Sequence, residues 1–473
     1  MVYLAAILVY LLILTGIGIY KSRQVKTQAD FSVAGRTLSP WVMVLTMLAV
    51  WIGTGSIVGN AEEAYRTGMA ALIIPLGTFI GMILLALIAT KARNIEASSV
   101  PEIIGSRFGL VARFLAVIAL VTAYMVIVSY QFNAGGAVIE VITASAVTKE
   151  KATFIAAVFI IVYTMLAGLK SLASMDIVTG SIITISLVIA FPVLLVKAGG
   201  FEGMRTAYET VQNKPSHMQF WGVYSPVHII NYLLPTFLLV MGDANQYQRI
   251  FASRNAKGAR QAVIALIFVA LVIELLIIAS AWVAGSMTPD PENGRYILIY
   301  AARHYMPFAL GILFMITVVG IIVSTADSFL LVPATCFIND VYSAYINPKA
   351  EQKKVIFISR ILVLTFGVIA YLVTHAFAET TGFFKKALYA YTIYGSAITP
   401  SLVAAMFWKR ATKAGAISSI LVGTITTLLW AEVIKDHLPA KVADLDAVLP
   451  AITLSVICLI VVSLMTGKKT TGG

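Results

Sequence analysis

Charged residues are scarce in this chain, since Asp, Glu, Lys and Arg together make up only 12% of its 473 residues. A soluble domain carries about 25%. Hydrophobic residues make up 59%, and the mean hydropathy is +0.91. The composition excludes a soluble globular protein. It predicts an all-α polytopic membrane protein, because a helix satisfies its own backbone hydrogen bonds inside a bilayer.

Cysteines and the common catalytic motifs are also rare or missing. The two cysteines, Cys336 and Cys458, lie in apolar surroundings and form neither a disulfide framework nor a metal site. No GxxxxGK[ST] or HExxH motif occurs, and the five histidines are scattered. We therefore expect no ATP hydrolysis, no embedded hydrolase and no other enzyme activity.

Thirteen apolar segments are long enough to cross a bilayer. They lie at about residues 3–20, 40–60, 68–90, 112–142, 152–167, 176–196, 226–249, 261–287, 305–340, 355–377, 387–408, 413–434 and 449–467. The longest pieces between them, about 197–225 and 287–304, are too short to fold alone, so we expect a single integral domain. The first segment lacks a basic n-region and a cleavage site, and is expected to be a retained span.

The positions of Lys and Arg predict the orientation of the chain. An odd number of spans places the termini on opposite sides, and with Met1 outside, 22 of the 34 Lys and Arg fall in inner segments. Because cytoplasmic loops carry the excess of positive charge, we expect an inner or plasma membrane protein with its N-terminus outside and C-terminus inside. This topology explains the net charge of +12, so we expect no nucleic-acid partner.

A glycine cluster interrupts the second apolar segment. Three glycines fall within residues 53–59, interspersed with Thr54 and Ser56. Glycine disfavours a helix interior by about 1 kcal/mol relative to alanine, so we expect a broken helix. Its freed backbone groups can bind ions and polar solutes. The alternative is a packing face of small residues between two helices. Pro235 predicts a kink or break in the seventh segment, which would make a second discontinuous helix.

Acidic residues within apolar segments are candidates for ion or solute binding, because they are costly in a bilayer. Asp327 lies beside Ser324, Thr325 and Ser328, and this oxygen-rich set suits Na⁺. The alternative is a buried aspartate bonded to the neighbouring hydroxyls for structural reasons.

Three further residues leave two interpretations open. Asp176, near the start of the sixth segment, is either an ion ligand or an acidic helix cap. Glu274, in the middle of a segment, is a proton or substrate group or a helix contact. Trp51 presents an aromatic face that either binds a cation or packs against its surroundings.

The chain resembles the sodium/solute symporter family, which includes sodium–glucose, proline, sialic acid, pantothenate and choline transporters. The segments that carry the resemblance are Asp30–Arg36, Ala49–Gly68, Ala167–Asp176, Gln248–Arg260, Gly320–Tyr342 and Pro400–Gly415. The resemblance implies a LeuT-type inverted repeat of five plus five helices with flanking helices. The implied parts are a first flanking helix and loop at 1–36, repeats at 37–197 and 225–410, and two C-terminal flanking helices at 411–473.

The resemblance also implies site residues. The implied main sodium site uses the carbonyls of Ala49, Ile52 and Ile321 and the hydroxyls of Ser324 and Thr325. An implied second site, for sodium or a proton, uses Asp176, Asp327 and Ser328. Asp327 departs from the family, where serine often stands. The implied substrate-facing positions are Trp51, Ser56, Pro75, Thr78, Phe237, Val240 and Thr392.

Together these features predict a Na⁺-coupled importer of a small organic solute that works by alternating access in the lipid bilayer. Proton-coupled symport is an alternative, motivated by Asp327 and Glu274. A channel would need a continuous polar lining, and a membrane sensor would need an appended signalling domain, which we do not expect after Gly473. Local likeness to the choline-transporter branch at Trp51 and 61–65 does not define the solute. The number of ions per cycle and the oligomeric state stay open.

Overall fold

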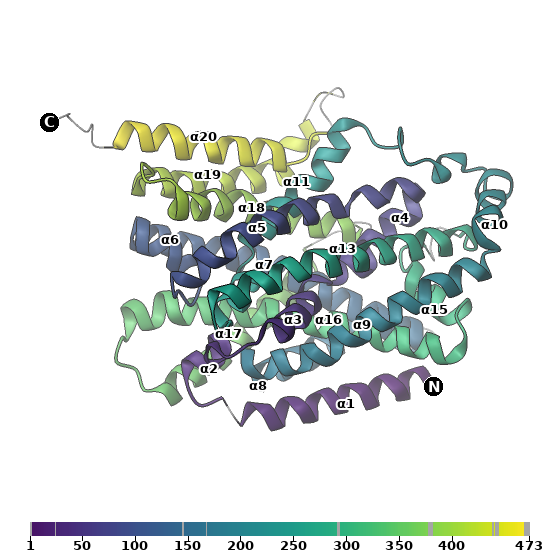
Figure 1. Cartoon of the computed structure of the whole chain (residues 1–473), viewed down its shortest axis with the longest axis horizontal. Helices are drawn as coiled ribbons and strands as arrows, with labels where there is room; N and C mark the ends of the chain where they lie inside the picture. Colours follow the sequence, from purple (N-terminus) through teal and green to yellow (C-terminus); the bar gives the residue numbers. More distant parts are fainter. Residues whose placement is uncertain are drawn as a thin grey trace.

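The computed structural model describes residues 2–23, 25–143, 146–166, 168–290, 294–376, 382–437, 439 and 444–467, and contains helices but no β-strand within these ranges. The helices that form the bundle lie side by side (Figure 1). They are α1 (Val2–Ser22), α3 (Pro40–Trp51), α4 (Ala61–Thr67), α5 (Pro75–Asn94), α7 (Leu110–Ile142), α8 (Lys149–Leu166), α9 (Leu169–Lys197), α11 (Pro226–Gly242), α12 (Ala244–Ala252), α13 (Ala256–Ser286), α16 (Phe308–Phe337), α17 (Gln352–Val373), α18 (Phe383–Phe407), α19 (Lys413–Leu429) and α20 (Val448–Thr466). The shorter helices include α2 (Gln28–Val33), α6 (Val100–Phe108), α10 (Gly200–Thr206) and α15 (Ile297–His304).

Every predicted apolar segment overlaps a helix of this bundle. Within the described residues, ten spans are long and apolar enough to cross a membrane, and the bent pair at Pro40–Trp51 and Gly55–Ile73 makes an eleventh. The two remaining predicted spans correspond to α8 and α18. The first turn of α8 carries three charged residues, and α18 is rich in Ser, Thr, Tyr and Lys. This lowers the hydropathy of both helices, although they pack in the bundle like their neighbours.

The first and last helices place the two ends of the described chain at opposite ends of the bundle (Figure 1). The helix α1 begins at the end where α10 and α15 lie, and α20 finishes at the opposite end, where α6 lies (Figure 1). We call these the α10 end and the α6 end. Residues 468–473, which carry the predicted cytoplasmic C-terminus, lie outside the described residues. Which end faces the cytoplasm stays a prediction.

The break predicted at the glycine cluster is confirmed. The helix α3 ends at Trp51, Ile52 leaves the helical conformation with ψ at 88°, and the chain resumes as a π-helix at Gly55–Asn60. The two halves are bent by 56°. A Cβ at Gly53 would lie 2.9 Å from Cγ2 of Thr325. Glycine therefore lets the broken backbone lie against α16.

The second break lies eight residues beyond the predicted position. Pro235 is inside α11, which continues to Gly242, and the chain turns at Asp243. There the hydroxyl of Tyr394 donates to the Gly242 carbonyl at 2.7 Å, and the Asp243 side chain caps α12 by accepting from the Asn245 amide at 3.1 Å. These groups satisfy the open backbone. The seventh segment is therefore discontinuous, as predicted, but it breaks at Asp243 and not at Pro235, because proline removes only one amide bond whereas a break also needs such partners.

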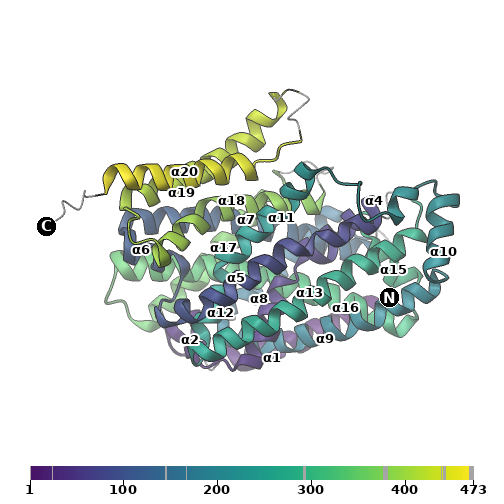
Figure 2. The ribbon, with the colours of Figure 1, turned by 45° about the horizontal axis from the view of Figure 1, so that its top comes forward.

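Helix contacts repeat in two halves of the bundle. The helices α3 and α9 pack together, as do α11 and α18, and α5 contacts α11 just as α13 contacts α3. These are the equivalent pairs that the predicted five-plus-five repeat requires. The helices α19 and α20 pack on each other and against α18, and form one edge of the molecule (Figure 2).

Candidate ion and solute site

The first broken helix and α16 bring four of the five predicted sodium ligands together in pairs. The hydroxyl of Ser324 lies 3.4 Å from the Ala49 carbonyl, and that of Thr325 lies 3.5 Å from the Ile52 carbonyl. The fifth, Ile321, lies one turn earlier on α16 and is fully buried. The two carbonyls are free because α3 ends between them, so the break itself exposes the backbone oxygens.

The spacing of these oxygens suits a hard monovalent cation. Oxygen ligands of Ca²⁺, an ion of nearly the same radius as Na⁺, lie about 2.4 Å from the metal. Two such ligands at right angles are about 3.4 Å apart, close to the measured 3.4 and 3.5 Å. All five groups are neutral, which disfavours a multivalent ion. The arrangement can therefore bind Na⁺ between a helix of each predicted repeat.

Asp176 lies directly behind this set. Its Oδ1 accepts a hydrogen bond from Ser324 at 2.7 Å, and its Oδ2 accepts one from Thr46. It is buried, seven residues after the first residue of α9, so the alternative of a helix cap is wrong. When Ser324 donates its proton to Asp176, its lone pairs are free to face a cation.

Arg249, which the sequence analysis did not name as a site residue, also lies beside this set. It is one of the 22 Lys and Arg expected in inner segments, yet its side chain is fully buried. Its guanidinium lies 3.5 Å from Asp176 and donates to Ser328 at 2.8 Å. Buried arginine is rare unless paired. Arg249 follows the helix break at Asp243 by six residues, and this position could have marked it as a site residue. The sequence analysis expected the break near Pro235, so this signal was not used.

The three residues of the predicted second cation site, Asp176, Asp327 and Ser328, do not share one hydrogen-bond partner. Asp176 and Ser328 both face the guanidinium of Arg249. Asp327 instead accepts a hydrogen bond from Thr164 of α8 at 2.7 Å. A positive charge from the protein thus stands beside Asp176, where the sequence suggested a second sodium ion.

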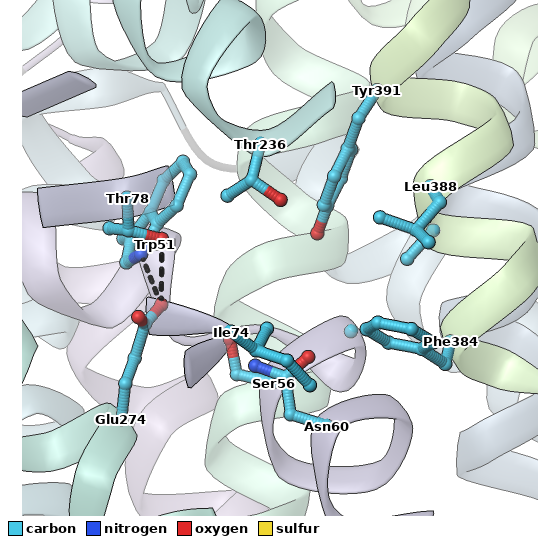
Figure 3. Close-up of a pocket in the computed structure, with 12 residues that line it drawn as sticks. Trp51, Ser56, Asn60, Ile74, Thr78, Thr236, Glu274, Phe384, Leu388 and Tyr391 are labelled. Atoms are coloured by element: carbon cyan, nitrogen blue, oxygen red, sulfur yellow. Dashed lines mark hydrogen bonds between the residues drawn. The ribbon is translucent and has the colours of Figure 1, made fainter. Parts of the chain in front are cut away.

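A small cavity lies beside the broken helix (Figure 3). The atom-free volume of the cavity is about 320 Å³, a value that includes space open to its surroundings. Its lining residues are Trp51, Gly55, Ser56, Asn60, Ile74, Thr78, Thr236, Glu274, Phe384, Ala387, Leu388 and Tyr391. The indole of Trp51 donates to Oε1 of Glu274 at 2.7 Å, and Thr78 donates to the same oxygen at 3.4 Å. Aromatic, apolar and convergent polar groups are typical of a solute site.

Three of the predicted substrate positions, Trp51, Ser56 and Thr78, line this cavity. Phe237 and Val240 do not, because they lie on the part of α11 that packs against Gly81 of α5. Pro75, the first residue of α5, is buried one residue beyond Ile74 and is not among the lining residues. The sequence analysis missed Thr236, one residue before Phe237, and named Thr392 of α18 in place of the α18 residues that line the cavity, Phe384, Ala387, Leu388 and Tyr391.

Thr392 lines a second, wider cleft next to the cavity. The cleft encloses about 2060 Å³, including space open to solvent, and extends past Arg66 at the tip of α4. Leu388 lines both spaces. Between them, the rings of Tyr232 and Phe384 meet edge to face with their centres 4.8 Å apart. This pair and Leu388 separate the cavity from the cleft.

Two comparisons with known proteins agree with this geometry. The sodium:solute symporter family model matches residues 31–423. The osmoregulated proline transporter OpuE of Bacillus subtilis is 26% identical over 476 residues, with 97% of this chain and 94% of that protein covered. The sodium/proline symporter of Haemophilus influenzae is 24% identical over 481 residues, with 96% and 92% covered.

Solved structures show the same architecture. A Na⁺-coupled sialic acid symporter in a substrate-bound outward-open state has a TM-score of 0.82 at 17% identity, with 98% of both chains covered. Mhp1, a nucleobase-cation-symport-1 family transporter, has a TM-score of 0.63 at 12% identity, with 93% and 95% covered. The fold is that of a LeuT-type secondary transporter. The chain belongs to the sodium:solute symporter family, and its activity is Na⁺-coupled symport of a small solute.

Proposed function

We propose that this protein imports a small organic solute bound in the cavity of Figure 3, driven by Na⁺ bound at Ser324 and Thr325. The observation that carries the proposal is the pairing of these hydroxyls with the open carbonyls of α3 at 3.4 and 3.5 Å. The cycle requires movement of helices around bound ligands, and no covalent chemistry.

Coupling between the two ligands follows from the shared helix. Ile52 supplies a carbonyl to the ion site, and its neighbour Trp51 lines the solute cavity. A cation that fixes the broken backbone also fixes the indole. Each ligand then raises the affinity for the other by the same factor.

We propose that the wide cleft is the access route from outside. At the α6 end, the Lys91 ammonium donates to the Met406 carbonyl at 2.5 Å, and Arg107 donates to the Lys409 carbonyl at 2.6 Å. These bonds tie α5 and α6 to the end of α18. With this end bonded and the cleft open at the other, the arrangement is an outward-facing state if the predicted orientation holds, with the N-terminus outside and the α6 end in the cytoplasm.

L-Proline is the first solute to test, because the relatives above are named as proline transporters. Purified protein in liposomes should accumulate labelled L-proline under an inward Na⁺ gradient and not under an equal K⁺ gradient. Trp51→Ala removes a cavity wall and should weaken solute binding while Na⁺ binding persists. Accumulation that is indifferent to the replacement of Na⁺ by K⁺ would refute sodium coupling, and accumulation driven by a pH gradient alone would favour proton symport.

A further inference from the structure

We infer that Glu274 is the specificity residue of the cavity and binds a positively charged, N–H-bearing nitrogen of the solute. This inference rests on the proposed function, because it takes the cavity beside Trp51 as the solute site. It extends that function by naming the chemical class of the solute, a small primary or secondary amine. Sugars and other solutes without such a nitrogen are excluded.

One oxygen of Glu274 has partners and the other has none. Oε1 accepts from the indole of Trp51 at 2.7 Å and from Thr78 at 3.4 Å. Oε2 is buried and has no hydrogen-bond partner among the described residues. Buried polar atoms in proteins are nearly always hydrogen-bonded, so an orphaned carboxylate oxygen points to a ligand.

The charge of Glu274 is also unmatched. No Lys, Arg or His in the described part of the chain lies within 4.0 Å of its carboxylate. The side chain is only 2% exposed and belongs to the middle of α13. A buried carboxylate is costly unless a positive charge or hydrogen bonds compensate it. An ammonium group would supply both the charge and the missing donor.

The other polar groups of the cavity are neutral. Figure 3 shows Glu274 and Trp51 on one side and the Tyr391 hydroxyl on the opposite side, with Thr236 above and Ser56 and Asn60 below. These hydroxyl and amide groups can donate to a carboxylate or another acceptor at the far end of a solute. Among the lining residues, only Glu274 carries a formal charge. The cavity therefore requires a positive charge only at the end of the solute that faces Glu274.

A purely structural role of Glu274, as an acceptor that holds the Trp51 indole, makes a different prediction. Glu274→Gln keeps an oxygen that can accept from Trp51, and removes only the charge. Trp51→Phe keeps the charge and removes only the indole donor. If holding the indole is what matters, Trp51→Phe is the damaging change. If the charge matters, Glu274→Gln is the damaging change for amine recognition.

The test is a thermal-shift and competition assay on the purified full-length protein in saturating Na⁺. Solutes are compared in matched sets. Each set contains an amine and analogues that differ only at its nitrogen. The first set is L-proline, its oxygen analogue tetrahydro-2-furoic acid, and N,N-dimethylproline, which keeps the positive charge but has no N–H. In the wild type, we expect L-proline to bind at least tenfold more tightly than either analogue. Glu274→Gln should remove that preference, and Trp51→Phe should retain it.

Several outcomes would overturn the inference. These are equal binding of an amine and its oxygen analogue by the wild type, an intact amine preference in Glu274→Gln, or no stabilisation by any amine of the panel. The stabilisation by Na⁺ alone is read in the same assay without solute. Its presence alongside a failed amine preference refutes only the role of Glu274, whereas its absence counts against the sodium site of the proposed function.

Discussion

Nη2 of Arg249 lies 3.5 Å from Oδ2 of Asp176, and the side chains of both residues are buried in the middle of the bundle. Oδ1 of the same carboxylate lies 2.7 Å from the Ser324 hydroxyl. The pair therefore sits next to the proposed sodium site, and Asp176 can orient Ser324 without leaving an unbalanced charge.

Loss of Arg249 should destabilise the protein and change its response to sodium. Removing one partner of a buried ion pair costs about 3–5 kcal/mol, because the other charge is left uncompensated. We expect Arg249→Gln to lower the unfolding midpoint in Na⁺-free buffer. Added Na⁺ should raise it more than in the wild type, because a cation can then compensate Asp176. Differential scanning fluorimetry measures both effects.

The exposed pair of Arg205 and Glu202, 3.5 Å apart, provides the matched control. Exposed ion pairs contribute about 0–1 kcal/mol, so Arg205→Gln should change neither the midpoint nor the sodium response. The double variant Asp176→Asn with Arg249→Gln should recover Na⁺-free stability. An Arg249→Gln protein with wild-type stability and sodium response would show that the pair is unimportant.

Gly53 should be intolerant of a side chain. A Cβ there would lie 2.9 Å from Cγ2 and 3.2 Å from Oγ1 of Thr325, so Gly53→Ala must displace a proposed ligand. We expect a several-fold loss of sodium affinity, measured as the Na⁺ concentration that gives half-maximal thermal stabilisation. Gly16 of α1 has nothing within 4 Å of such a Cβ. Gly16→Ala should keep wild-type affinity, and equal effects of both changes would contradict the account.

Asp327 should not be a ligand of the proposed sodium site. Its Oδ1 accepts a hydrogen bond from Thr164 of α8 at 2.7 Å, whereas Asp176 is the carboxylate that accepts from Ser324. We therefore expect Asp327→Asn to keep the wild-type dependence of uptake on Na⁺ concentration in liposomes. A shallower dependence would restore a second sodium site that includes Asp327. Wild-type uptake driven by a pH gradient without Na⁺, and abolished by Asp327→Asn, would identify it as a proton carrier.

The orientation of the chain can be tested by cysteine labelling of intact cells. Single cysteines at Glu209 and Lys257 occupy exposed positions in a predicted outer and a predicted inner segment, in a variant without Cys336 and Cys458. An impermeant maleimide should label position 209 in intact cells, and position 257 only after permeabilisation. The opposite pattern would reverse the topology, and labelling of both positions in intact cells would contradict the count of spans.

The sequence predicted those parts of the fold that depend on neighbouring residues. The break at Gly53 is encoded locally, since three glycines within seven residues weaken the helix wherever they are placed. The break at Asp243 depends on Tyr394, which lies about 150 residues away and bonds to the open backbone. Pro235 is the stronger local signal, and a local signal alone therefore suggested the wrong position.

The same distinction explains the site. Ser324 and Thr325 could be proposed as ligands because they are adjacent on one helix, in a segment that resembles the family. The pairing of Asp176 with Arg249 joins α9 to α12, and that of Glu274 with Trp51 joins α13 to α3. The residues of each pair are far apart in the sequence, so the spacing of residues along the chain could not predict either pairing. Arginine is a residue type that is common in cytoplasmic loops, so the sequence offered no reason to place Arg249 at the site. Its burial in the structure is what distinguishes it.

Sodium binding by the Ser324 and Thr325 hydroxyls is the central claim, and equilibrium binding of ²²Na⁺ to the purified protein tests it most directly. The wild type should bind Na⁺ saturably, without competition from K⁺. Hydrogen bonds and ligations to charged groups contribute roughly 1.5–3 kcal/mol each, so Ser324→Ala combined with Thr325→Ala should weaken binding at least tenfold. Thr365→Ala, which removes an exposed hydroxyl bonded only within α17, should not. Undiminished ²²Na⁺ affinity in the double variant would contradict the account.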